Sequence, residues 1–208
     1  MKRPSVVVLD YGSGNLRSAQ RALDRAGADV TVTSSLEDAA NADGLVVPGV
    51  GAFAACMAGL DALDAGPMIA DRVAAGRPVL GICVGMQILF EYGDEHGVVT
   101  KGLGLLPGGV TRLDAPVVPH MGWNVVQPPA GSVLFAGMPE GSRFYFVHSY
   151  AAHPSPALAE GRLVTTSVHN VPFVAAIEAG PLMATQFHPE KSGDLGCALL
   201  RNWLATLT

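Results

Sequence analysis

The chain has 208 residues, 49% of them hydrophobic and 15% charged, which is enough to build the core of one compact domain. Its formal net charge of -5 and the absence of any run of Lys or Arg argue against nucleic acid or an anionic membrane as the main partner. The three cysteines, Cys56, Cys83 and Cys197, form no CxxC pair, so neither a disulfide framework nor a structural metal site is expected.

No apolar segment approaches the roughly 20 residues that span a bilayer, and Asp10 interrupts the apolar run near the N-terminus. We therefore expect a soluble, unexported protein in the reducing cytoplasm. No linker or repeat divides the chain, so we expect a single domain over residues 1–208.

Residues 1–90 alternate between short apolar runs and stretches with helical periodicity, which is typical of βαβ units. Runs without polar alternation suit parallel strands that are buried on both faces. The expected strands are Val6–Leu9, Val30–Val32, Gly44–Val47 and Val79–Ile82, and the expected helices are Asn15–Arg25, Phe53–Leu63 and Met68–Ala75.

From about Val98 onward, Gly and Pro recur and short strand-like runs dominate. The expected strands here are Trp123–Val126, Arg143–Tyr150, Leu163–Val168, Phe173–Glu178 and Leu182–Phe187, followed by a helix over Leu195–Leu204. The predicted fold class is α/β, with a central, mostly parallel sheet flanked by helices and a more β-rich, partly antiparallel C-terminal half.

A glycine-rich loop from Gly12 to Arg17 follows a strand and opens a helix, as dinucleotide-binding loops do. Arg17 stands where the third glycine of GxGxxG belongs, which argues against a nucleotide site. We expect no cofactor.

The strongest chemical feature is the segment Val79 to Gln87, in which an apolar strand runs into Gly-Ile-Cys-Val-Gly and then into a helix-like Met-Gln-Ile-Leu-Phe. This pattern predicts a nucleophile elbow at Cys83, because glycines on both sides allow a sharp turn. A helix N-terminus behind Cys83 would favour its thiolate. Cys56 and Cys197 lie among Ala, Leu and Met and are interpreted as small buried hydrophobic residues.

A thiolate nucleophile in acyl transfer needs a base that a third group orients. His188 ends a predicted strand and is followed by Pro189 and Glu190, and an extended backbone would project both side chains to the same side. The pattern therefore predicts a triad of Cys83, His188 and Glu190. His148 is the rival base, but no acid lies near it in the sequence, and its aromatic neighbours suit a buried histidine.

Of the other histidines, His120 and His169 are expected in loops, while His96 and His153 belong to no motif.

The motifs GICVGMQ around Cys83 and HPEKSG from His188 resemble those of the class I glutamine amidotransferases, which have a flavodoxin-like fold. Within that class, the chain resembles the glutaminase subunits of imidazole glycerol phosphate synthase. The blocks that carry this resemblance are DYGSGNLRS from Asp10, PGVGAF from Pro48, PHMGWN from Pro119, FVHSY from Phe146 and QFHPEKS from Gln186.

The resemblance implies that Cys83 attacks the side-chain amide of glutamine and that the resulting thioester is hydrolysed to glutamate. The oxyanion would meet the N–H of Val84, which follows the nucleophile, and the N–H of Val50. Gly49 and Gly51 would permit a peptide flip at Val50.

The resemblance also assigns glutamine binding to Gln87 and to the backbone of Ser149 and Tyr150. The implied partner is the cyclase subunit, a (β/α)₈ barrel that uses the ammonia in histidine biosynthesis. Residues implied at the interface with the cyclase are Asn15, Met121, Trp123, Tyr145 and Lys191.

Three alternatives stay open at this point. Glutaminases of anthranilate or GMP synthesis read Cys-Leu-Gly-His-Gln where this chain has Cys83 to Gln87, and that of pyridoxal phosphate synthesis has Gly-Gly-Glu-Ser in place of Pro48 to Gly51. A cysteine peptidase or deglycase-like enzyme on the same elbow would lack the His-Pro-Glu pairing. A catalytically dead interaction module would not need Cys83, His188 and Glu190 intact.

Overall fold

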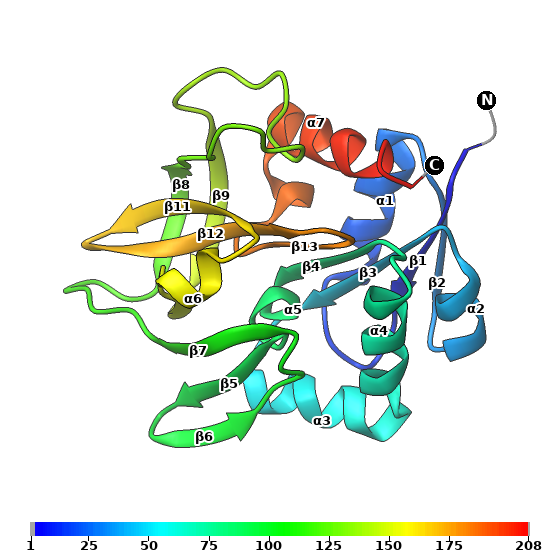
Figure 1. The fold of residues 1–208 in the computed structure, drawn as a ribbon, viewed down its shortest axis with the longest axis horizontal. Helices are drawn as coiled ribbons and strands as arrows, with labels where there is room; N and C mark the ends of the chain where they lie inside the picture. The colour runs from blue at the N-terminus through cyan, green and yellow to red at the C-terminus, as the bar shows by residue number, and fades with distance from the viewer. Residues whose placement is uncertain (1–2, 208) are drawn as a thin grey trace.

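A central sheet organises the protein, whose structure, a computed structural model, describes residues 3–207. Within those residues, seven strands form this sheet in the order β11-β12-β13-β4-β3-β1-β2 (Figure 1). Their bounds are β1 (Ser5–Leu9), β2 (Asp29–Thr33), β3 (Gly44–Gly49), β4 (Val79–Cys83), β11 (Leu163–His169), β12 (Val171–Ala179) and β13 (Leu182–Thr185). Strands β2, β1, β3, β4 and β13 run parallel, whereas β12 and β11 are antiparallel additions at the edge. The predicted fold class is confirmed.

Helices cover both faces of this sheet, which explains why its central strands are apolar throughout. On one face lie α1 (Leu16–Ala26) and α7 (Gly193–Leu204); on the other lie α2 (Leu36–Asn41), α3 (Phe53–Leu63) and α4 (Ala65–Ala74) (Figure 1). Strands β3, β4 and β13 are buried along their whole length. Leu23 of α1 is fully buried, and fully buried Trp203 of α7 packs on Gly44 of β3. The C-terminal ends of β3 and β4 meet at one edge, where the site lies.

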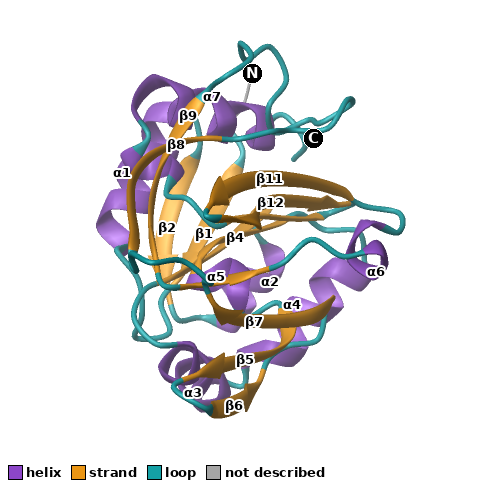
Figure 2. Cartoon of the chain, turned by 90° about the vertical axis from the view of Figure 1, so that its left-hand side faces the viewer, coloured by secondary structure: helices purple, strands orange, loops and turns teal. Residues whose placement is uncertain are grey.

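A second, four-stranded sheet packs beside α3, in the order β10-β7-β5-β6 (Figures 1 and 2). Its strands are β5 (Phe90–Glu95), β6 (Val98–Lys101), β7 (Leu106–Arg112) and β10 (Tyr150–Ala152). Strands β8 (His120–Val125) and β9 (Arg143–His148) form a separate antiparallel ribbon. The remaining elements are the short helices α5 (Val84–Gln87) and α6 (Pro156–Ala159) and the 3₁₀ turn η1 (Pro189–Lys191).

The sequence pattern did not predict β5, β6 or β7, and glycines within β5 and β7 explain why those two strands were missed. Glycine is depleted in strands, but here it makes room for aromatic rings. A Cβ on Gly93 would lie 2.5 Å from the ring of Phe53, and one on Gly109 would lie 2.2 Å from the ring of Tyr92. Gly93 thus lets β5 pack on Phe53 of α3, and Gly109 lets β7 pack on Tyr92 of β5. The same glycines weaken the strand pattern of β5 and β7 in the sequence.

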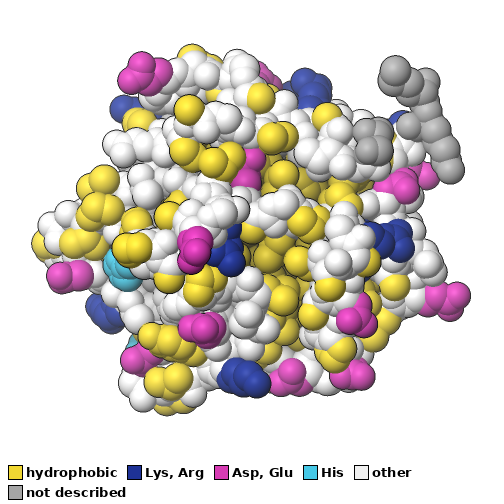
Figure 3. Space-filling view, in the orientation of Figure 1, with side chains coloured by type: hydrophobic (Ala, Val, Ile, Leu, Met, Phe, Trp, Pro, Cys, Tyr) yellow, Lys and Arg dark blue, Asp and Glu magenta, His cyan; other side chains and the backbone are white. Residues whose placement is uncertain are grey.

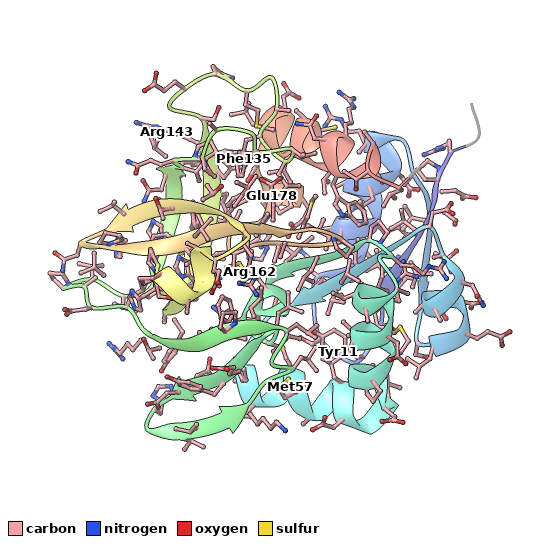
Figure 4. All side chains as sticks on the ribbon, viewed as in Figure 1. Tyr11, Met57, Phe135, Arg143, Arg162 and Glu178 are labelled. Carbon is pink, nitrogen blue, oxygen red and sulfur yellow. The ribbon has the colours of Figure 1, made fainter. Side chains whose placement is uncertain are left out.

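The long connection between β8 and β9 is fastened to the central sheet by a buried carboxylate. Glu178 of β12 accepts hydrogen bonds from the Ser132 hydroxyl and from the N–H groups of Val133 (2.8 Å) and Leu134 (3.2 Å). In Figure 4, Glu178 lies close to Phe135 of the same connection. Because a buried carboxylate needs such donors, this contact fixes the position of the loop.

Among the described residues, no single helix is long and apolar enough to cross a membrane; α3 and α4 have the length and composition only as a pair, with a bend of 88° between them. On the face shown in Figure 3, Lys and Arg side chains lie apart from one another among acidic ones.

Candidate active site

Cys83 lies at a strained turn between β4 and α5, as the elbow pattern predicts. Its backbone has φ 57° and ψ -114°, a conformation that a residue with a Cβ rarely adopts. The flanking glycines are required by space: a Cβ on Gly85 would lie 1.9 Å from the carbonyl oxygen of Val47, and one on Gly81 would lie 2.7 Å from that of Gly85. The turn thus packs directly against the backbone of β3, and this contact fixes the position of Cys83.

The helix behind Cys83 is shorter than predicted. Only Val84–Gln87 is helical, and β5 begins at Phe90. The carbonyls of Ile88 and Leu89, which a longer helix would use, accept hydrogen bonds from the segment that leads into β7. One helical turn carries little dipole, so the expected helix-terminus contribution to the thiolate is correspondingly small.

His188 and Glu190 form a buried pair. The Nδ1 atom of His188 lies 2.7 Å from Oε1 of Glu190, and their side chains are only 3% and 4% exposed. The expectation of an extended backbone here is wrong, because Pro189–Lys191 forms the 3₁₀ turn η1. Helix α7 presses on this turn so closely that a Cβ on Gly196 would lie 1.9 Å from the carbonyl of Pro189. The turn therefore folds Glu190 back onto His188.

The electrostatics of His188 reflect two acidic neighbours. Burial alone would lower its pKa, but interactions with Cys83 and Glu190 outweigh burial and raise the pKa from 6.5 to about 9. The Nε2 atom of His188 has no hydrogen-bond partner among the described residues. Nδ1 is thus committed to Glu190, while Nε2 stays available beside the sulfur. The structure brings the three predicted triad residues together.

The N–H of Val50, one of the two expected oxyanion donors, is already occupied. It donates to the hydroxyl of Ser13 (3.2 Å), and that hydroxyl lies 3.0 Å from the Val50 carbonyl, to which it can donate. Both ends of residue 50 are therefore held by one side chain from the loop after β1. Sequence reasoning missed Ser13, since a serine in a glycine-rich loop carries no signal of a contact so distant in sequence.

The two glycines beside Val50 differ in role. Gly51 has φ 88° and open space around it, which fits the predicted torsional freedom. Gly49 has an ordinary φ, but a Cβ there would lie 2.5 Å from the backbone nitrogen of Gly85. Close packing against the elbow therefore requires glycine at this position.

Tyr11 and Cys56 also contact the end of β3 or the Ser13 side chain that holds Val50. The Tyr11 hydroxyl donates to the carbonyl of Pro48, and Cys56 Sγ lies 3.2 Å from the Ser13 hydroxyl. Burial is the main cause of the raised pKa values of the Tyr11 phenol and the Cys56 thiol. Figure 4 shows Tyr11 in the region of Met57, and Gly59 of the same helix approaches the Tyr11 carbonyl. Cys56 is fully buried, as predicted, although it also has a polar partner.

An open cleft of about 440 Å³ lies in front of Cys83. The predicted site residues that line it are Val50, Gly51, Cys83, Val84, Gln87, Ser149, Tyr150, His188 and Lys191. Gln87 is only 3% exposed, so it does not lie on an exposed helix face. Its Nε2 donates to the carbonyl of Tyr150 (2.9 Å), while the carbonyl of Ser149 accepts from Leu113 (2.9 Å). The cleft is large enough for an amino-acid substrate.

The residues predicted at a partner interface are largely on the outer surface of the β8–β9 ribbon. Met121 is 67% exposed and Trp123 is 54% exposed, and Trp123 pairs across the ribbon with half-buried Tyr145 at a ring separation of 6.0 Å. Asn15 and Lys191 are also exposed. Such a cluster of aromatic and Met side chains is typical of an interface centre.

The ribbon is hydrogen-bonded directly to the turn that carries His188. The carbonyl of Tyr145 accepts from the His188 N–H (3.0 Å), and the Tyr145 N–H donates to the Ser192 hydroxyl (3.0 Å). Ser192 in turn donates to the His188 carbonyl (2.7 Å). The backbones of Tyr145 and His188 are thus joined by a direct hydrogen bond and by the Ser192 hydroxyl.

Three histidines gather at the inner side of the ribbon. The expectation of loops for His120 and His169 is wrong: His120 begins β8 opposite His148, and His169 ends β11 with its ring stacked 4.3 Å from that of His120. Burial lowers the pKa of His120 to about 4 and that of His148 to about 3. Within residues 3–207, no group of three or more His, Cys, Asp or Glu side chains could hold a metal ion.

A family model described as glutamine amidotransferase class-I matches residues 7–207. A solved chain of PurLQS from Thermotoga maritima has a TM-score of 0.73 at 21% identity, with each chain covered over 100% of its length. The glutaminase domain of Trypanosoma brucei CTPS, with bound acivicin, has a TM-score of 0.70 at 15% identity, covering 99% of this chain and 94% of that one. Structures at such identities support the fold alone. The fold and the family model together define a class-I glutamine amidotransferase.

Closer relatives narrow the family. The chain is 64% identical to the imidazole glycerol phosphate synthase subunit HisH of Thermobifida fusca over 211 residues, which cover 99% of this chain and 100% of the relative. It is also 64% identical to the subunit of the same name from Mycolicibacterium paratuberculosis over 207 residues, which cover 100% of both. The chain belongs to the HisH family of imidazole glycerol phosphate synthase glutaminase subunits.

Proposed function

We propose that this chain hydrolyses glutamine through a thioester on Cys83 and passes the ammonia to the cyclase subunit of imidazole glycerol phosphate synthase in the cytoplasm. The observation that carries the proposal is the strained turn that holds Cys83 in the same cleft as His188, whose other nitrogen is bonded to Glu190. A nucleophile, a base and an orienting acid are what acyl transfer from an amide requires.

In this mechanism the Cys83 thiolate attacks the carboxamide carbon of glutamine. His188, protonated near neutral pH because of its raised pKa, gives its Nε2 proton to the amide nitrogen as the C–N bond breaks, so that the nitrogen leaves as ammonia. The neutral imidazole then takes a proton from water, which attacks the thioester and releases glutamate. Glu190 holds the Nδ1 side of the ring throughout, so that Nε2 remains the exchanging atom.

The oxyanion formed in each step would be stabilised by the N–H groups of Val84 and Val50. Because the Val50 N–H is bonded to Ser13, it must be released before it can serve, and the freedom of Gly51 supports a rotation there. Loss of one such donor typically costs a factor of about 10²–10³ in rate. A catalytic centre that lacks one donor would be slow until the strand rearranges.

The substrate would bind with its amino-acid end against Gln87 and the backbone of Ser149 and Tyr150. The Gln87 side chain is buried and ordered by hydrogen bonds before any ligand arrives, which favours binding. No cofactor is required by this chemistry.

The cyclase partner is proposed because free ammonia would be protonated and lost in water. The exposed Met121 and Trp123, half-buried Tyr145, and nearby Asn15 and Lys191 form the surface that would meet it. The acceptor enzyme would combine the ammonia with a phosphoribulosyl formimino ribonucleotide, giving imidazole glycerol phosphate and an aminoimidazole carboxamide ribonucleotide.

The test is ammonia release from glutamine by the chain with and without the cyclase subunit and its ribonucleotide ligand. We expect release in the full mixture, complete loss in Cys83→Ala, and normal release in Cys197→Ala, since Cys197 is a buried cysteine of α7 that the mechanism does not use. Absence of ammonia in the full mixture, or its persistence in Cys83→Ala, would refute the proposal.

A further inference from the structure

A second buried amide lies against the nucleophile. Gln186 follows β13 and is completely buried, and its Nε2 atom is 3.8 Å from the sulfur of Cys83. The steps described above do not use this side chain. A buried polar group without a solvent-exposed face must satisfy its hydrogen bonds locally, so its contacts define what it does.

The orientation of the Gln186 amide is fixed by its neighbours. The side-chain atom of Gln87 that lies 2.9 Å from the carbonyl of Tyr150 must be nitrogen, because a carbonyl only accepts. The same nitrogen lies 3.0 Å from Gln186, so the Gln186 atom facing it must be oxygen. The nitrogen of Gln186 therefore faces the sulfur. A reversed amide would place two donors together and an oxygen against the sulfur.

The Tyr150 carbonyl, which begins this chain of contacts, is held from the other side as well. It accepts from Nδ1 of His148 (2.9 Å), so Nε2 of His148 accepts from Nδ1 of His120 (2.9 Å). Nε2 of His120 then accepts from the side chain of Asn124 (3.1 Å). One directed series of donors and acceptors thus runs from β8 to Tyr150, and a second from Gln87 to the Cys83 sulfur.

We propose that Gln186 is a further catalytic residue of the glutaminase reaction, donating its amide N–H to the Cys83 sulfur whenever that sulfur is a thiolate. This inference rests on Cys83 being the nucleophile, as proposed above. A donor to the charged form favours that form. When sulfur attacks, its electron pair becomes the C–S bond and the charge moves to the glutamine oxygen. When the C–S bond breaks, the pair returns to sulfur and meets the same N–H.

The variant that tests this is Gln186→Met, which keeps the length of the side chain and removes its donor. We expect alkylation of Cys83 by iodoacetamide at pH 8, followed by mass spectrometry of the Cys83 peptide, to slow about tenfold, the loss expected for one weak bond to a charged group. In the assembled synthase, kcat should fall by a similar factor.

Gln87→Met is the matched control, because it removes the orienting partner and leaves the donor in place. It should chiefly raise KM for glutamine and slow alkylation less than Gln186→Met. Gln186→Glu keeps an oxygen for Gln87 but has no proton to donate once ionised, so it should also lose alkylation at pH 8, and it serves if Gln186→Met does not fold.

Wild-type alkylation in Gln186→Met or ionised Gln186→Glu, with only KM altered, would overturn the inference and leave Gln186 as a support for Gln87. That result differs from failure of the proposed function, in which Cys83→Ala would still release ammonia.

Discussion

Ser13→Ala should increase the ammonia release of the free subunit. The Ser13 hydroxyl holds both the N–H and the carbonyl of Val50, at 3.2 Å and 3.0 Å, and Val50 cannot serve an oxyanion while these bonds persist. Each such bond contributes about 0.5–1.5 kcal/mol net. Val50 is 41% exposed and its carbonyl lies 3.5 Å from the Cys56 thiol, so water and that thiol replace part of what is lost. Ser13 therefore favours the held strand over the released strand by about 1–2 kcal/mol. Its removal should raise the population of the released strand by a factor of roughly 5–30.

The assay is glutamine hydrolysis at saturating glutamine without the cyclase subunit, compared with the rate in its presence. The free rate should rise by that factor, while the stimulated rate changes little because the strand is already released there. Ser13→Thr keeps a hydroxyl and serves as the control, which should stay near wild type. A free rate in Ser13→Ala that is unchanged or lower would refute the view that Ser13 restrains the oxyanion strand.

Two further predictions concern stability. The raised pKa of His188 means that its protonated form stabilises the fold below pH 6.5 and that this contribution is lost as pH rises through about 9. Because Cys83 also raises this pKa, Glu190→Gln should remove only part of the shift. In urea unfolding, the advantage of wild type over Glu190→Gln should therefore shrink between pH 6.5 and pH 9 by less than the about 3 kcal/mol that the whole shift represents, and a constant gap would contradict this account. Gly85→Ala, whose Cβ would meet the Val47 carbonyl, should cost about 3 kcal/mol, against about 1 kcal/mol for Gly76→Ala, whose Cβ meets nothing within 4 Å. Thermal unfolding of the two glycine variants checks this prediction, and equal losses of stability would argue against packing as the cause.

The first half of the fold, the strained turn at Cys83 and the pairing of His188 with Glu190 could be predicted because their signals are local. Strands β3 and β4 are buried on both faces and are therefore continuously apolar in the sequence. Glycines next to Cys83 mark a turn whose space is filled by β3. His188 and Glu190 are two residues apart, so any compact turn brings them together, even though the turn is a 3₁₀ turn rather than an extended strand.

Contacts between distant segments could not be predicted in this way. Ser13 and Val50 meet only because the loop after β1 lies beside the end of β3, and nothing around Ser13 indicates a partner. Gln186 reads as one more residue of a strand end until the fold places it between Gln87 and Cys83. His120 was expected in a loop, whereas pairing with His148 across the ribbon places it in a strand.

The backbone ring formed by Tyr145, Ser192 and His188 has a consequence for how the protein can change over time. Tyr145 presents its side chain beside Trp123 on the proposed docking surface, while its peptide groups hold His188, the proposed catalytic base, in place. If these proposed roles hold, a substitution that refits this surface to a different acceptor enzyme would also shift His188, the proposed proton donor. A variant selected for a new partner should then carry a measurable change in turnover, and a variant selected for turnover should carry a change in partner binding.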